Sequence, residues 1–201
     1  INRSKAIRSS LAPFGAASVV FDLRTPLVAV DSLSAHLQTR DIPIGFSEAH
    51  DLTRDQGSIV PLYFLENAYD GLPPIVLSSP IGLDRSMALR LGRKLASYED
   101  GSTWGLVASG DLSHRLTPDA PAGFSPVGEQ FDKAVVESLQ RNDASPLMEL
   151  SPRTVEEAGE CGMRSVLAML GLVGELSGKI DVISYEGPFG VGYCNAIWMK
   201  E

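Results

Sequence analysis

The sequence has few of the residues that build disulfide scaffolds or metal clusters. It holds two cysteines and three histidines among 201 residues. Cys161 and Cys194 are far apart and lie in apolar surroundings. A small secreted domain held together by disulfides needs paired cysteines at short spacing, so we expect two reduced, buried thiols.

The chain also lacks a basic cluster and a long apolar run. Seventeen Lys and Arg face 25 Asp and Glu, which gives a net charge of −8. Nucleic acids and anionic membranes attract basic surfaces, so neither is expected as a partner. No apolar stretch reaches the roughly 18 residues of a membrane span, and no signal peptide is visible. These absences favour a cytoplasmic location.

Several catalytic motifs are missing as well. The sequence contains no G-x-G-x-x-G and no G-x-x-x-x-G-K-[ST], which bind nucleotide phosphates. It has no C-x-x-C pair and no H-E-x-x-H, which hold zinc. The nucleophile elbow G-x-S-x-G is absent too. Nucleotide enzymes, zinc proteases and α/β-hydrolases of the usual kind are therefore excluded.

What remains is an ordinary globular composition with alternating strand and helix patterns. Apolar residues make up 44% of the chain, enough for a sizeable core. Short runs of apolar or β-branched residues predict strands over Ser18–Leu23, Ile42–Phe46, Pro74–Ser79, Thr103–Ala108, Lys179–Tyr185 and Val191–Met199. Helical spacing predicts helices over Pro26–Arg40, Ser58–Tyr69, Asp84–Tyr98, Pro126–Arg141, Arg153–Ala158 and Gly162–Val173. We predict a single α/β domain over residues 1–201. Its central, mostly parallel sheet is flanked by helices and ends in a strand pair.

One stretch stands out at the end of a predicted strand. The run Trp104–Ala108 leads into Ser109–His114, which presents Asp111 and His114 three residues apart. Ligands of open α/β sheets bind beyond the carboxyl ends of strands, so this histidine is well placed for chemistry. The alternative is that Asp111 caps a turn and His114 has only a structural role. Spacing alone leaves both interpretations open.

Four ordered motifs carry a resemblance to a known family. They are D-Q-G-S-I-V-P-L-Y-F-L, A-S-G-D-L-S-H-R-L, E-A-G-E-C-G-M-R-S and S-Y-E-G-P-F-G-V-G-Y, which begin at residues 55, 108, 157 and 184. The chain resembles the catalytic subunits of class III extradiol ring-cleavage dioxygenases. It is most similar to the bacterial branch related to Memo proteins and associated with AMMECR1-type domains. The resemblance covers about residues 11 to 198.

The resemblance implies a metal centre and its ligands. Family enzymes hold Fe(II) with two histidines and one carboxylate, and the carboxylate position falls on Glu186. One metal histidine belongs to a D-H-G motif, where this chain has Gln56. The other belongs to an S-P-H-type turn near the N-terminus. No such turn occurs in the chain, so we expect it to precede Ile1 and regard the domain as N-terminally incomplete.

The same resemblance assigns roles around the metal. His114 falls on the acid–base histidine, which takes a proton from the catechol and returns it. Asp111 is expected to orient or charge-stabilise the imidazole. Tyr185 and Ser58 are assigned to substrate binding, and the loop 117–125 to the wall of the pocket.

The sequence is compatible with two functions. The first is a non-haem iron dioxygenase that cleaves catechol-type aromatics, with Fe(II) or another divalent metal in its place. The second is a Memo-like or degenerate-site module that binds a metal, a small ligand or a protein without dioxygenase activity. Under either, a small aromatic ligand, a homodimer and an AMMECR1-type domain are the expected partners.

Overall fold

The computed structural model describes residues 1–68 and 71–200. The chain divides into two compact units. The first comprises Ile1–Ser79 and Tyr98–Ser109, and the second comprises Pro80–Ser97 and Gly110–Glu201. The sequence has no linker-like stretch between them, so composition alone does not reveal this division.

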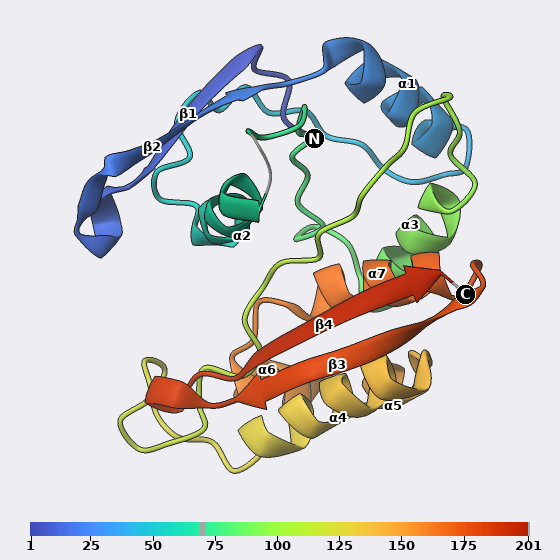
Figure 1. The fold of residues 1–201 in the computed structure, drawn as a ribbon. Coiled ribbons are helices and arrows are strands. Elements are labelled where there is room, and N and C mark those ends of the chain that lie inside the picture. Colours follow the sequence, from blue (N-terminus) through green and yellow to red (C-terminus); the bar gives the residue numbers. More distant parts are fainter. Residues whose placement is uncertain (69–70, 201) are drawn as a thin grey trace. The chain divides into compact units, whose positions relative to one another are not determined.

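Among its described residues, the first unit contains an antiparallel strand pair, one short helix and two longer helices (Figure 1). Strand β1 (Ala6–Leu11) and strand β2 (Ala16–Arg24) are joined by the short helix η1 (Ala12–Phe14). Helix α1 spans Leu27–Gln38 and helix α2 spans Gln56–Ala68. A small apolar core is formed by Ile7, Phe21, Leu23 and Leu62.

The second unit packs helices against a C-terminal strand pair (Figure 1). Its helices are α3 (Arg85–Leu95), α4 (Gly128–Arg141), α5 (Ser145–Met148), α6 (Pro152–Ala158) and α7 (Met163–Val173). Strands β3 (Gly178–Glu186) and β4 (Tyr193–Lys200) are antiparallel and joined through the short helix η2 (Pro188–Gly190). The core includes Phe131 and Val135 of α4, Leu167 and Leu170 of α7, and Ile180 of β3.

Helices α3 and α7 approach each other closely because both carry glycine at the contact. A Cβ atom on Gly92 would lie 1.8 Å from the carbonyl oxygen of Ala168. A Cβ atom on Gly171 would lie 2.0 Å from the carbonyl oxygen of Leu89. The contact between these helices therefore depends on backbone surfaces without side chains.

An irregularity in β3 decides which of its side chains face the helices. Ile180 and Val182 pair with Trp198 and Ala196, and these four residues join the core. The register shifts between Val182 and Ser184, so Ser184 pairs with Asn195 and Tyr185 with Cys194. Side chains alternate between faces along a strand, and an extra residue reverses the alternation. The bulge thus turns Tyr185 to the helix-covered face and Glu186 to the opposite face.

Most of the predicted helices are confirmed, as are the α/β class and the C-terminal strand pair. The last residue of the predicted helix Ser58–Tyr69 lies outside the described residues. The two described sheets are both antiparallel, so a central, mostly parallel sheet is not among them. Residues 42–46, 74–79 and 103–108 form no regular strand. Trp104 and Val107 are 41% and 55% exposed.

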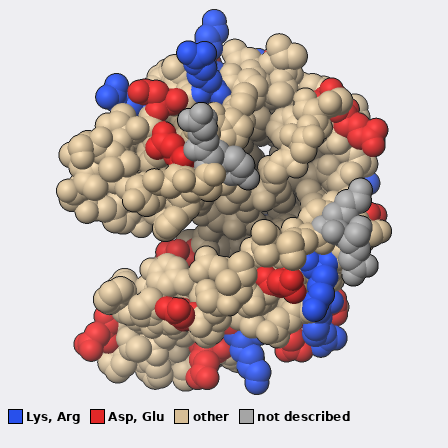
Figure 2. Space-filling view, in the orientation of Figure 1, with Lys and Arg blue, Asp and Glu red and all other residues tan. Residues whose placement is uncertain are grey.

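The surface carries charges of both signs. On the face in view, Lys and Arg lie among Asp and Glu over a mainly uncharged surface (Figure 2). Within the described ranges, no helix combines the length and apolar character needed to cross a membrane.

Candidate acid–base site

The segment that carries Asp111 and His114 lies beside the connection between β3 and β4. The N–H of Leu112 donates to the carbonyl of Gly192 at 2.9 Å, and the N–H of Gly192 donates to the carbonyl of Ser113 at 2.8 Å. Further along, the N–H of Leu116 donates to the carbonyl of Gly190 at 3.0 Å. These bonds hold an irregular segment in place as if it were an additional strand.

The His114 imidazole is held through both ring nitrogens. Its Nδ1 forms a hydrogen bond with the carbonyl oxygen of Gly159, at the left-handed C-terminal end of α6. Its Nε2 lies 3.3 Å from Oδ2 of Asp111. Because a carbonyl only accepts, Nδ1 is the nitrogen that keeps its proton. Nε2 is then the nitrogen that can gain or lose a proton. When Nε2 carries a proton, Asp111 accepts a hydrogen bond from it.

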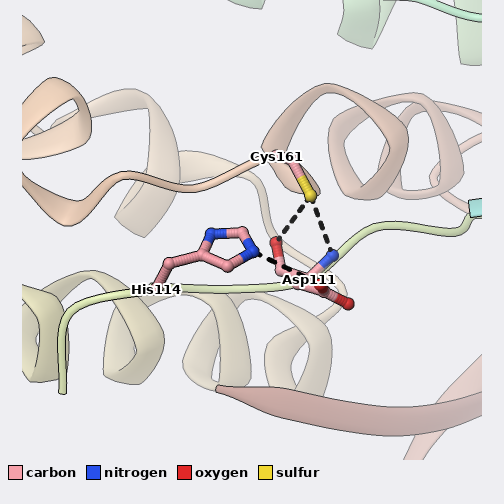
Figure 3. Close-up of side chains that lie close together, drawn as sticks. All are labelled: Asp111, His114 and Cys161. Carbon is pink, nitrogen blue, oxygen red and sulfur yellow. Dashed lines mark hydrogen bonds and ion pairs between the residues drawn. The ribbon is translucent and has the colours of Figure 1, made fainter. Parts of the chain in front are cut away.

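Cys161 completes a cluster with these two residues (Figure 3). Its Sγ accepts the N–H of Asp111 at 3.2 Å, and the Asp111 carbonyl accepts the N–H groups of Cys161 and Gly162 at 3.3 and 2.9 Å. The potential ligand atoms of Asp111, His114 and Cys161 lie within 4.8 Å of one another. The cluster brings together one carboxylate, one imidazole and one thiol.

The expectation that both cysteines are buried is wrong for Cys161. This residue is exposed, whereas Cys194 is partly buried. Cys161 directly precedes the N-cap of α7, where both its backbone N–H and its Sγ contact the backbone of Asp111. Partial burial nevertheless raises the pKa of its thiol, and the charges of Asp111 and Glu160 raise it further, although the hydrogen bond with the Asp111 N–H acts in the opposite direction. The thiol is therefore protonated at neutral pH.

Carboxylates surround the His114 imidazole. Asp111 is in direct contact, while Asp132 and Glu160 interact with His114 through their charges. Glu160 accepts the N–H of Met163 at 2.6 Å and so caps the first turn of α7. Burial raises the pKa of Glu160 above its usual value, although the Met163 bond and the charge of Arg164 act in the opposite direction. Three carboxylates thus act on one imidazole through contact or charge.

The Glu160→Gln variant is expected to gain stability relative to the wild type as pH rises from about 4 to 7. The raised pKa means that folded Glu160 holds its proton more tightly than unfolded Glu160. The wild type therefore loses unfolding free energy as pH rises through the folded pKa, whereas glutamine keeps an oxygen for the cap and does not titrate. Urea unfolding of both proteins across this range measures the difference. A difference that stays constant with pH contradicts the prediction.

Asp132 is a component of the site that the sequence prediction missed. It is fully buried on α4, where its Oδ1 accepts the N–H of Ser113 at 2.8 Å and its Oδ2 accepts the hydroxyl of Tyr185 at 2.7 Å. A signal was available in the sequence. Asp132 follows Phe131 and lies three residues before Val135, so helical spacing places a carboxylate on the apolar face of the helix.

Glu186 ends β3 on the face that the bulge turns away from the helices. Its cross-strand neighbour is Tyr193, and residues directly opposite in an antiparallel pair share a face. Burial raises the pKa of Tyr193, and the charges of Asp111 and Cys161 raise it further. Glu186 thus lies on the same face as Tyr193, whose pKa responds to the charges of Asp111 and Cys161.

The other predicted site residues are placed as follows. Gln56 is the first residue of α2 and is exposed, and the Ser58 hydroxyl donates to Oδ2 of Asp55 at 2.8 Å. Both belong to the first unit, whereas Asp111, His114, Tyr185 and Glu186 belong to the second. The Tyr185 hydroxyl is bonded to Asp132.

The donor set does not match the iron centre that the resemblance implies. Two imidazoles and a carboxylate are required, but the second unit has one histidine, because His36 and His50 belong to the first. The Nδ1 of that histidine is already bonded to Gly159. The residues of this unit therefore do not form the expected set of iron ligands by themselves.

The sequence is similar to a known protein family and to a clostridial protein. Residues 3–195 match the family described as the catalytic LigB subunit of aromatic ring-opening dioxygenase. A stretch of 143 residues is 40% identical to Protein CA_C1420 of Clostridium acetobutylicum, and it covers 69% of this chain. That stretch amounts to 30% of the length of the clostridial protein.

Proposed function

Because the chain belongs to the family of catalytic LigB subunits of aromatic ring-opening dioxygenases, we propose that it acts on catechol-type aromatics with His114 as the acid–base residue. The family supports oxidoreductase chemistry and aromatic metabolism. Cleavage beside the diol, the catechol substrate and the use of iron are the proposed refinements.

The contacts of the two ring nitrogens of His114 are the observation that supports this proposal. A catechol binds a metal as its anion, so a nearby base must accept a proton. Because the carbonyl of Gly159 keeps the proton on Nδ1, the lone pair of Nε2 is the proton acceptor. Asp111 lies 3.3 Å from that nitrogen and stabilises the imidazolium that results. The pair therefore suits the uptake of one proton and its later return to the product.

Iron enters the proposal through the family alone. When bound, Fe(II) supplies the centre at which the aromatic diol and dioxygen meet. We propose Glu186 as its carboxylate ligand, and Gln56 occupies the position of a family metal histidine. Ser58 and Tyr185 stay predictions as substrate-binding residues, although the bond between Tyr185 and Asp132 gives its hydroxyl a partner inside the protein.

A second candidate function has its own support. Gln56 offers a neutral amide where an imidazole is expected, and the second unit holds one histidine. A Memo-like module that binds an aromatic ligand or a metal without reacting with oxygen fits these departures. An oxygen-uptake experiment separates the two functions.

The protein that contains this chain, loaded anaerobically with Fe(II), is expected to consume one dioxygen per catechol and to form a ring-opened product that contains both oxygen atoms. An oxygen electrode and mass spectrometry with labelled dioxygen measure this. Hydroquinone is the matched control, because its two hydroxyl groups are not adjacent. Catechol binding in calorimetry without oxygen uptake assigns the second function. Failure to retain a divalent metal in elemental analysis overturns the iron assignment.

A further inference from the structure

Burial of the Asp132 carboxylate costs free energy. It has no exposed surface, and the adjacent Phe131 and Val135 are also fully or almost fully buried. Removing a carboxylate from water requires hydrogen bonds or a positive charge in compensation. Within the part of the chain that the structure describes, no lysine or arginine forms an ion pair with it. Burial raises the pKa of Asp132 above its usual value, whereas two hydrogen bonds and the imidazole of His114 act in the opposite direction and favour the carboxylate.

Both hydrogen-bond donors come from residues next to the proposed catalytic groups. Ser113 directly precedes His114, and Tyr185 directly precedes Glu186. Ser113 donates its N–H to Oδ1, and Tyr185 donates its hydroxyl to Oδ2. One carboxylate on α4 thus joins two segments that are more than 70 residues apart in sequence.

The surroundings leave this junction little freedom. Ser113 is fully buried, and its hydroxyl donates to the carbonyl of Ala158 at 2.8 Å. Gly192 lies against the carboxylate, and a Cβ atom there would fall within 1.9 Å of Oδ2 of Asp132. A Cβ atom on Gly128 would fall 2.6 Å from the Ser113 hydroxyl oxygen. Two glycines therefore make room for the contacts that hold Ser113 and Asp132 together.

We propose that Asp132 is a positioning residue, whose buried charge and two hydrogen bonds fix the segments that carry His114 and Glu186. Its role in turnover rests on the ring-opening function proposed above. The effect of Asp132 on His114 is independent of that function, because it follows from contacts within the second unit. Asp111, Glu160 and Asp132 all act on the imidazole by their charges, with Arg164 opposing Glu160.

The first test replaces the charge and keeps the shape. Asp132→Asn retains an oxygen that can accept from Ser113 but removes a negative charge near His114. In NMR titrations, we expect the midpoint of the His114 ring signal to move to lower pH, while those of His36 and His50 stay in place. The His114 signal is assigned by its loss in His114→Gln. In the iron-loaded protein, we expect kcat with catechol to fall about tenfold or more, with KM nearly unchanged.

The matched control is Asp181→Asn, which causes the same change in net charge on β3. Asp181 is exposed and pairs with Lys179 at 3.8 Å. It is expected to leave both the His114 midpoint and kcat at their wild-type values. An Asp132→Asn protein with wild-type titration and wild-type turnover overturns the proposal. A shifted midpoint in a protein that opens no ring supports the positioning of His114 and refutes the proposed function, so the two failures are distinguishable.

A second variant covers the case in which Asp132→Asn does not fold. Tyr185→Phe removes one hydroxyl from a residue that is 40% exposed and leaves the carboxylate charge and the Ser113 bond intact. We expect kcat to fall several-fold and KM to stay near the wild-type value. A raised KM with unchanged kcat identifies Tyr185 as a substrate contact and overturns its positioning by Asp132.

Discussion

Replacement of His114 by alanine is expected to lower kcat for catechol ring opening by roughly 10²- to 10⁴-fold, the usual contribution of general acid–base catalysis. The variant removes the nitrogen that accepts the proton. Its two lost hydrogen bonds, to Gly159 and Asp111, lie in a loop segment and are expected to cost about 1–2 kcal/mol of unfolding free energy in total. Oxygen uptake and urea unfolding of the same protein preparation measure the two effects.

His50→Ala is the matched control for His114→Ala. His50 is exposed in the first unit, and its backbone carbonyl accepts the N–H of Arg8 at 2.8 Å, a bond that the substitution leaves in place. Activity and stability should both stay at wild-type values. If His114→Ala instead lost on the order of 3 kcal/mol of unfolding free energy, a value typical of core disruption, the histidine would have a structural role.

Gly92→Ala should have the largest effect on stability, with a loss of about 3 kcal/mol of unfolding free energy. The added methyl would lie 1.8 Å from the carbonyl oxygen of Ala168 and 2.6 Å from the amide nitrogen of Leu172. Both atoms belong to the backbone of α7, so neither can rotate away and the helices must separate. Differential scanning calorimetry should show a fall in Tm of roughly 10 °C.

Gly82→Ala provides the contrast in the same unit. No atom lies within 4 Å of a Cβ atom at this position, and its φ lies outside the left-handed region. Alanine restricts the unfolded chain and is expected to stabilise the protein by about 0.4–1 kcal/mol. An unchanged Tm in Gly92→Ala would mean that α3 and α7 do not meet at their glycines.

Local patterns predicted the helices because a helix is specified within a few turns of its own sequence. Asp84 shows this well, since it was placed at the start of a helix and its carboxylate accepts the N–H of Met87 at 2.7 Å. Strands depend on neighbours elsewhere in the chain. The apolar run 103–108 predicted a buried strand, but in the structure it has no ladder partner and its large side chains are exposed.

The same distinction applies to the site. The spacing of Asp111 and His114 is local, and the structure places their side chains in contact. Gly159, Cys161 and Asp132 reach that pair through folding across 18 to 50 residues, and no periodicity reports such contacts. The sequence alone showed only that a charged residue, Asp132, falls on an apolar helix face.

The two hydrogen bonds of Asp132 cannot both form until the chain has been synthesised through Tyr185. Ser113 and Asp132 leave the ribosome before Tyr185 and Gly192, which follow more than 50 residues later. Until they arrive, one oxygen of the carboxylate has no protein donor and stays hydrated, and that end of α4 remains open. A nascent chain that has reached only α7 thus carries the histidine without its completed surroundings.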